Sequence, residues 1–131
     1  NQEPTNGAFR VPRILVIDDE NLVCFTIERI LASAGHTVVT AENGAVGLRR
    51  QRETPFDLVI TDILMPEQDG IETVRALKAE FPKLPIIAVS GGGRMVNMNY
   101  LQMVTDFGVA DTIAKPFLPD EILAKIAAAL K

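Results

Sequence analysis

The chain has 131 residues, of which 47% are hydrophobic and 5% aromatic, which suits one domain with a chiefly aliphatic core. Its formal net charge is −4 and no stretch is strongly basic, which argues against direct binding of nucleic acid. The single cysteine excludes an internal disulfide, and no apolar run approaches the roughly 20 residues of a membrane helix. We therefore expect a cytoplasmic protein that binds neither membrane nor nucleic acid.

The chain begins with a polar stretch without periodicity, so we expect a disordered tail or linker remnant over residues 1–11 and one domain over residues 12–131. In that domain, short apolar runs typical of strands buried on both faces alternate with helical patterns. In chain order, the predicted elements are a strand over 14–17, a helix containing 23–31 that stops at Gly35, a strand over 37–40, a helix capped by Asn43 and running to about 52, a strand over 58–60, a helix capped by Asp69 and ending before Pro82, a strand over 86–89, a helix over 100–107, a strand over 109–114, and a helix opening at Pro119.

This alternation of strands and helices predicts the α/β class. Strands separated by helices form a parallel sheet with helices on both faces. Right-handed crossovers then leave a few doubly wound arrangements. In such a sheet, ligands bind beyond the carboxyl ends of the strands, at the point where the strand order reverses.

Polar side chains occur at four of the five expected strand ends. Asp18 and Asp19 follow the first strand, Asp62 the third, Ser90 ends the fourth, and Lys115 follows the fifth. If the first and third strands are neighbours, repulsion between their carboxylates should raise the pKa of at least one group unless a cation intervenes. A hard ion such as Mg²⁺ meets that need, and aspartate can act as a nucleophile toward a phosphoryl group.

These residues lie in motifs that closely resemble the receiver domains of two-component response regulators, including chemotaxis regulators. The matching stretches are residues 14–20 (ILVIDDE), residues 62–70 (DILMPEQDG), Ser90 and residues 115–117 (KPF), and the resemblance extends over about residues 13–131. It implies a flavodoxin-like (βα)5 three-layer sandwich with the parallel strand order 2-1-3-4-5. It also implies a signalling switch that catalyses its own phosphorylation and dephosphorylation, and no turnover enzyme.

The resemblance assigns a role to each polar residue at the strand ends. The phosphoacceptor would be Asp62, which would also bind Mg²⁺, or Mn²⁺ in its place. The other implied roles are direct metal ligation by Asp19, ligation through water by Asp18, ligation by the main-chain carbonyl of Leu64, and contacts of Lys115 and Ser90 with phosphoryl oxygens. The donor would be a histidine kinase or a histidine phosphotransfer protein, and the output a downstream target or a linked effector domain. A cis Lys115–Pro116 bond is also implied.

One departure concerns the switch. Receivers often carry Tyr or Phe three residues before the lysine, and Thr112 stands there in this chain. A rotation of Thr112 would change little surface, so we expect the movement of Ser90 to pass into residues 91–93, which are all glycine. Ordering of that segment would then be the switch.

Other interpretations remain open. An Asp-Asp pair after a strand can simply cap the next helix, and a serine before glycines is often an ordinary loop residue. A second function is an aspartate-nucleophile phosphohydrolase or phosphotransferase that acts on small substrates. Such enzymes commonly carry Asp-x-Asp on the first strand, whereas here the candidate nucleophile is on the third strand and is followed two residues later by Leu64. A third is a degenerate receiver that only binds partners.

Overall fold

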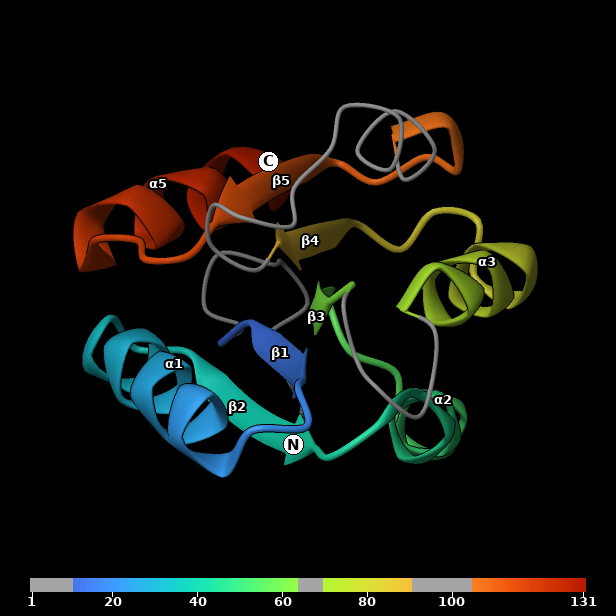
Figure 1. Ribbon diagram of the computed structural model, residues 1–131, viewed down its shortest axis with the longest axis horizontal. Helices are drawn as coiled ribbons and strands as arrows, with labels where there is room; N and C mark the ends of the chain where they lie inside the picture. Colours follow the sequence, from blue (N-terminus) through green and yellow to red (C-terminus); the bar gives the residue numbers. More distant parts are fainter. Residues whose placement is uncertain (1–10, 64–69, 91–104) are drawn as a thin grey trace, which may run out of the picture.

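The computed structural model describes residues 11–63, 70–90 and 105–131 and contains a parallel five-stranded sheet (Figure 1). The strands are β1 (Arg13–Ile17), β2 (Thr37–Ala41), β3 (Leu58–Asp62), β4 (Ile86–Ser90) and β5 (Asp111–Ala114). Their order is β2-β1-β3-β4-β5, so the doubly wound arrangement implied by the resemblance is confirmed. The order reverses between β1 and β3, which places the carboxyl ends of these two strands side by side.

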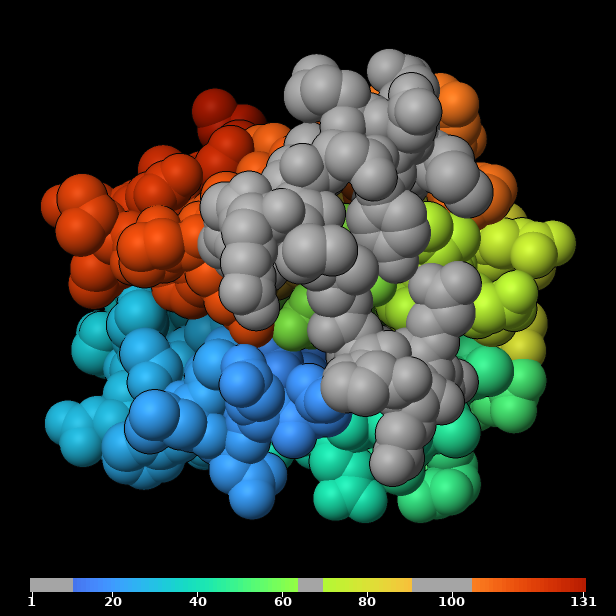
Figure 2. Space-filling view, viewed as in Figure 1, coloured from blue at the N-terminus to red at the C-terminus, as the bar shows by residue number. Residues whose placement is uncertain are grey.

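Helices cover both faces of the sheet. They are α1 (Asn21–Ser33), α2 (Gly44–Glu53), α3 (Gly70–Glu80) and α5 (Pro119–Ala129). Figure 1 shows α1 and α5 on one face and α2 and α3 on the other, and the surfaces of α1 and α5 adjoin in Figure 2. Asp69, residues 91–93 and most of the helix expected over residues 100–107 lie outside the described residues. No helix in the described part is long and apolar enough to cross a bilayer.

The continuous apolar runs of the sequence become strands buried on both faces. In β1, Ile14 and Val16 pack with α1 and α5, while Leu15 and Ile17 pack on the side of α2 and α3. All four are fully buried, because successive side chains of a strand point to opposite faces. The two apolar layers thereby fix the sheet and the direction of its polar strand ends.

The last strand is shorter than predicted. We predicted residues 109–114, whereas β5 begins at Asp111, paired with Ile87 of β4. Gly108, with φ 94°, turns the chain just before this strand. The side chain of Val109 packs instead against a cluster that includes Ile63 and Ile71, so this apolar residue belongs to the core but not to the strand.

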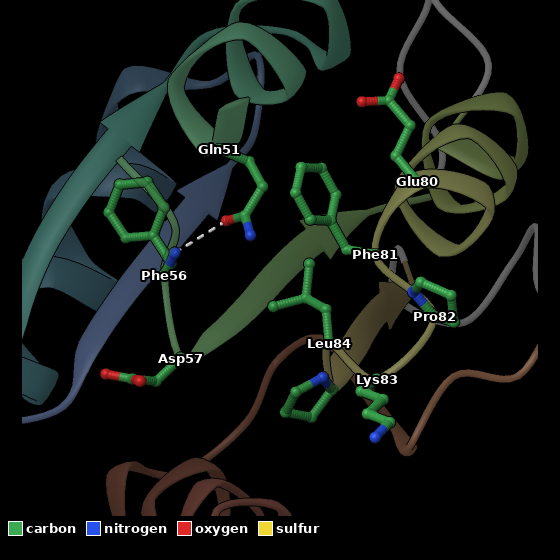
Figure 3. Close-up of a pocket in the computed structure, with 9 residues that line it drawn as sticks. Gln51, Phe56, Asp57, Glu80, Phe81, Pro82, Lys83 and Leu84 are labelled. Atoms are coloured by element: carbon green, nitrogen blue, oxygen red, sulfur yellow. Dashed lines mark hydrogen bonds between the residues drawn. The ribbon is translucent and has the colours of Figure 1, made fainter. Parts of the chain in front are cut away.

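The amino-terminal edge of the sheet, opposite the carboxyl ends, is closed by hydrogen-bonded connections. The Oε1 atom of Gln51 accepts a hydrogen bond of 2.9 Å from the main-chain nitrogen of Phe56 (Figure 3). The ammonium of Lys78 donates to the carbonyl oxygens of Pro82 and Leu84 at 2.9 and 3.0 Å. These bonds hold the connections that lead into β3 and β4.

The predicted cap of the second helix gives a test of the fold. The side chain of Asn43 accepts a hydrogen bond of 2.8 Å from the nitrogen of Val46, and α2 begins at the next residue, Gly44. Asn43→Ala should lower the free energy of unfolding by about 1 kcal/mol, since a first-turn N–H loses its acceptor. Urea unfolding measures this, and Asn43→Asp is the matched control that keeps the acceptor. Equal losses in both variants would contradict the cap.

Candidate phosphoacceptor and metal site

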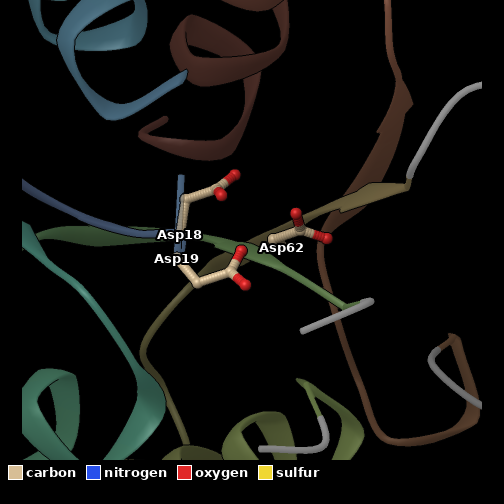
Figure 4. Close-up of side chains that lie close together, drawn as sticks. All are labelled: Asp18, Asp19 and Asp62. Carbon is tan, nitrogen blue, oxygen red and sulfur yellow. The ribbon is translucent and has the colours of Figure 1, made fainter. Parts of the chain in front are cut away.

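Three carboxylates meet where β1 and β3 end. Ile17 pairs with Thr61, so the next residues, Asp18 and Asp62, leave neighbouring strands at the same level. Asp18, Asp19 and Asp62 each place one carboxylate oxygen within 4.8 Å of the others (Figure 4). Asp18 and Asp62 are 2% and 4% exposed, whereas Asp19 is open to solvent.

The ammonium of Lys115 lies against these acids. Its Nζ is 3.0 Å from Oδ2 of Asp62, 3.4 Å from Oδ2 of Asp18 and 3.6 Å from Oε1 of Glu20. Burial alone would lower the pKa of Lys115, but its hydrogen bond to Asp62 and the attraction of Asp62 and Asp18 outweigh that effect. The pKa of Lys115 is therefore raised, and the group stays charged at neutral pH.

Asp18 has the raised pKa expected of a crowded carboxyl group, although the leading cause differs from our prediction. Burial is the largest contribution, and repulsion from Asp62 adds to it. The main-chain N–H of Glu20, which donates to Oδ1 of Asp18 at 2.9 Å, and the charge of Lys115 act in the opposite direction. The net effect raises the pKa of Asp18 to about 6.

The other residues of the predicted site lie at two further strand ends. Ser90 ends β4 and is 4% exposed, and its carbonyl oxygen accepts a hydrogen bond of 3.0 Å from the nitrogen of Lys115. The Lys115–Pro116 peptide bond is cis, as the resemblance implies. Thr112 is half-buried in β5, opposite Ala88 of β4 and two positions before Ala114 at the strand end. Leu64 lies outside the described residues.

Sequence reasoning gave no role to two residues that shape the site. Glu20, next to the acid pair, adds a third carboxylate within reach of Lys115, beside those of Asp18 and Asp62. Gly70, the first residue of α3, has no room for a side chain: a Cβ there would lie 2.6 Å from the carbonyl oxygen of Asp62 and would also meet the backbone of Ile63. The place of Gly70 at the end of the matching stretch 62–70 was the available signal, but only the close approach of α3 to β3 explains why glycine stands there.

A hidden thiol also touches the site from α1. Cys24 is buried, and its Sγ–H donates to the carbonyl oxygen of Asp18 at 3.4 Å. Burial is the largest cause that raises the pKa of this thiol to about 11, and the negative charge of Asp18 adds to it. Cys24 also packs in the apolar core on the side of α1 and α5.

The donors at this edge fit a divalent hard cation. Asp18, Asp19 and Asp62 supply carboxylate oxygens, the ligand type that Mg²⁺ prefers. With Glu20, the strand ends carry four carboxylates, three of which pair with the single positive charge of Lys115. This excess of negative charge favours a cation at the open side of the cluster, where Asp19 faces solvent.

Comparisons with known proteins agree with this arrangement. A sequence profile described as the response regulator receiver domain matches residues 14–127. Transcriptional regulatory protein PrrA of Mycobacterium leprae is 35% identical over 120 residues, which are 92% of this chain and 50% of PrrA. The chain therefore spans about half the length of the curated relatives it matches.

Two solved structures are similar over nearly the whole chain. A response regulator receiver domain protein from Clostridium thermocellum has a TM-score of 0.84 and 30% identity, covering 92% of this chain and 94% of that one. Chemotaxis protein CheY4 of Vibrio cholerae has a TM-score of 0.85 and 25% identity, covering 92% of this chain and 99% of that one.

The raised pKa of Asp18 predicts how stability depends on pH without metal. Between pH 3.8 and about 6 the unfolded chain has released the Asp18 proton and the folded chain has kept it, so the free energy of unfolding falls as pH rises. The full loss is about 3 kcal/mol. Urea unfolding from pH 4 to pH 7 in EDTA measures it. Asp18→Asn should flatten this dependence, and Mg²⁺ should restore stability at pH 7 in the unmodified chain alone. A slope that survives in Asp18→Asn would contradict the assignment.

The contact of Gly70 with the backbone of β3 predicts a second effect. Gly70→Ala should cost about 1–3 kcal/mol of stability and slow acyl phosphate labelling, because the new methyl group displaces the backbone of Asp62. Gly47→Ala is the matched control, since a Cβ at Gly47 meets only the movable side-chain end of Ile17 and the methyl of Ala41. Stability by urea unfolding and labelling by intact mass are measured together. The idea fails if both variants label as fast as the unmodified chain.

Proposed function

Because this chain belongs to the response regulator receiver domain family, whose members are phosphorylation-dependent signalling switches, we propose that Asp62 is its phosphoacceptor. The observation that carries this proposal is the contact of Asp62 with Lys115 at 3.0 Å, beside Asp18 at the point where the strand order reverses. Among the three clustered carboxylates, Asp62 is the one that lies on β3, and its distance to the ammonium of Lys115 is shorter than that of Asp18. Asp18 and Asp19 would then serve to hold Mg²⁺.

The transfer is a displacement at phosphorus. A carboxylate oxygen of Asp62 attacks the phosphorus of a phosphohistidine whose other ring nitrogen carries a proton. The P–O bond forms, the P–N bond breaks, and the imidazole leaves as a neutral group with the electron pair of the broken bond. Mg²⁺ held by Asp18, Asp19 and Asp62, with the carbonyl of Leu64, would neutralise charge on the phosphoryl oxygens. Positioning and positive charge are the main requirements of this reaction, and the ammonium of Lys115 supplies both.

The same residues provide contacts for the product. Once Asp62 carries a phosphoryl group, the ammonium that pairs with its carboxylate can pair with a phosphoryl oxygen instead. Ser90 ends the neighbouring strand and would donate its hydroxyl to another phosphoryl oxygen. Lys115 is bonded through its main chain to Ser90, so a shift of either residue is passed to the other. We propose that the movement of Ser90 and Lys115 on phosphorylation also reaches Thr112 on β5.

The surface beside the site suits a protein donor. Leu22 on α1, Phe25 on α1 and Leu118 before α5 are exposed by 75%, 53% and 71%. Leu22 follows Asp19 by three residues and Leu118 follows Lys115 by three, so both are close in sequence to residues of the site. A histidine kinase or histidine phosphotransfer protein could bury them while presenting its phosphohistidine to Asp62. The output of the whole protein would pass through a downstream target or a linked effector domain, as the name of PrrA suggests for that relative.

Acetyl phosphate with Mg²⁺ tests the acceptor and the reaction class together. The unmodified chain should gain one phosphoryl group per chain and then stop consuming acetyl phosphate except at the rate of dephosphorylation. Asp62→Asn should abolish labelling, because an amide is no comparable nucleophile. Asp120→Asn is the matched control, since Asp120 is an exposed acid in the first turn of α5.

Intact-mass spectrometry reads the labelling and phosphate release reads the turnover. Undiminished labelling of Asp62→Asn would sink the assignment. Rapid multiple turnover of small acyl phosphates would favour the phosphohydrolase instead, and a chain that is never labelled would indicate a receiver that only binds partners.

A further inference from the structure

A cavity of about 540 Å³ lies at the amino-terminal edge of β3 and β4, at the far end of the sheet from Asp62 (Figure 3). Its volume falls within the roughly 300–1,000 Å³ typical of small-molecule sites. The apolar part of the wall comes from two aromatic rings, one leucine and two prolines: Phe56, Phe81, Leu84, Pro82 and Pro85. The phosphoryl chemistry proposed above uses none of these residues.

The wall is held in place without a ligand. Gln51 fixes the connection before β3 through its Oε1, and Lys78 fixes the connection before β4 through two carbonyl oxygens. Arg52 at the end of α2 forms an ion pair with Glu80 at the end of α3, above the cavity. A site with fixed walls loses little conformational freedom when a ligand binds.

The side-chain amide of Gln51 faces this space. Gln51 is 2% exposed, and its Oε1 is used by Phe56. Its Nε2 donates no hydrogen bond within the described part of the chain, and Figure 3 shows this amide turned toward the hollow beside Phe81. This N–H group has no protein acceptor among the described residues, so an oxygen acceptor in the cavity can form a hydrogen bond with it.

The charged groups around the cavity indicate which charge the ligand should carry. Asp57 already accepts a hydrogen bond of 2.7 Å from the nitrogen of Arg13, and Glu80 is paired with Arg52. The guanidinium of Arg13 stacks on Phe56 at 4.6 Å from the ring centroid. Lys83 lines the mouth and has no ion pair among the described residues. Both carboxylates that line the cavity are therefore engaged, and its two unengaged polar groups, Gln51 and Lys83, are donors.

We propose that this cavity binds a small aromatic carboxylate that carries a second oxygen acceptor opposite its carboxylate. The ring packs against Phe56, Phe81 and Leu84, the second oxygen accepts from Nε2 of Gln51, and the carboxylate pairs with Lys83 at the mouth. The site is separate from Asp62 and does not depend on the proposed function.

The test is a titration of the ¹⁵N-labelled full chain with 4-hydroxybenzoate, read by NMR. Saturable shifts are expected at the side-chain NH₂ signals of Gln51 and at the amides of Phe56 and Leu84. Benzoate lacks the second oxygen and 4-hydroxybenzyl alcohol lacks the carboxylate, so each should bind roughly tenfold more weakly. An unshifted Gln51 signal at up to about 10 mM probe, where even a millimolar site is nearly filled, would overturn the proposal.

Matched variants separate recognition from folding. Gln51→Glu keeps the acceptor for Phe56 but replaces the donor, and Lys83→Gln removes the exposed charge, so both should weaken binding roughly tenfold. Arg49→Gln, an exposed cation elsewhere on α2, should bind normally, and so should Asp62→Asn. If Gln51→Glu does not fold, Lys83→Gln and the two probe analogues decide. Equal affinity in Lys83→Gln and the unmodified chain, or equal affinity for all three probes, would refute the proposed recognition.

Discussion

The carboxylates of Asp18 and Asp62 share the ammonium of Lys115 in a place that water barely reaches, and the rest of the molecule is arranged around this contact. The strand order brings the two acids together, since β1 and β3 are paired, Asp18 follows β1 and Asp62 ends β3. Burial resists a second full charge, so Asp18 holds its proton more tightly than a free carboxyl group would. The apolar layers on both faces of β1 keep the strands in register and prevent the acids from moving apart.

This unbalanced charge is what gives the site its chemistry. If every carboxylate of the cluster were paired with a cation of the protein, the cluster would not attract a metal ion. Here the open side of the cluster, at Asp19, lies next to solvent, while its closed side is fixed by Lys115 and by the backbone of β4. A metal ion can balance the excess negative charge of the acids, and a phosphoryl group can pair with the ammonium of Lys115.

Much of this was predictable from the sequence because local signals were strong. Apolar runs of four to six residues fixed the strands to within two residues, and the cap at Asn43 marked the start of α2. Strand-end positions brought Asp18, Asp62 and Lys115 together once the order of the strands was supplied by the resemblance. The predicted start of β5 was wrong because the apolar side chain of Val109 packs in the core, although the residue lies before the paired strand.

What could not be predicted depends on distances between segments far apart in the chain. The close approach of Gly70 to Asp62 is set by how α3 sits on β3, and no periodicity encodes it. The dominance of burial over repulsion at Asp18 needs the packed surroundings of the carboxyl group. The cavity at the other edge arises from two connections whose sequences, taken separately, are ordinary turns.

The thiol of Cys24 has a consequence for the environment in which such a site can work. It lies one hydrogen bond from the backbone of Asp18, where an oxidised sulfur would disturb the acid cluster at once. A thiol with a pKa of about 11 is ionised in roughly one molecule in 10⁴ at neutral pH, and the thiolate is the form that attacks peroxides and disulfides. Burial, with the neighbouring Asp18, thus keeps this thiol protonated and slows its reaction with oxidants.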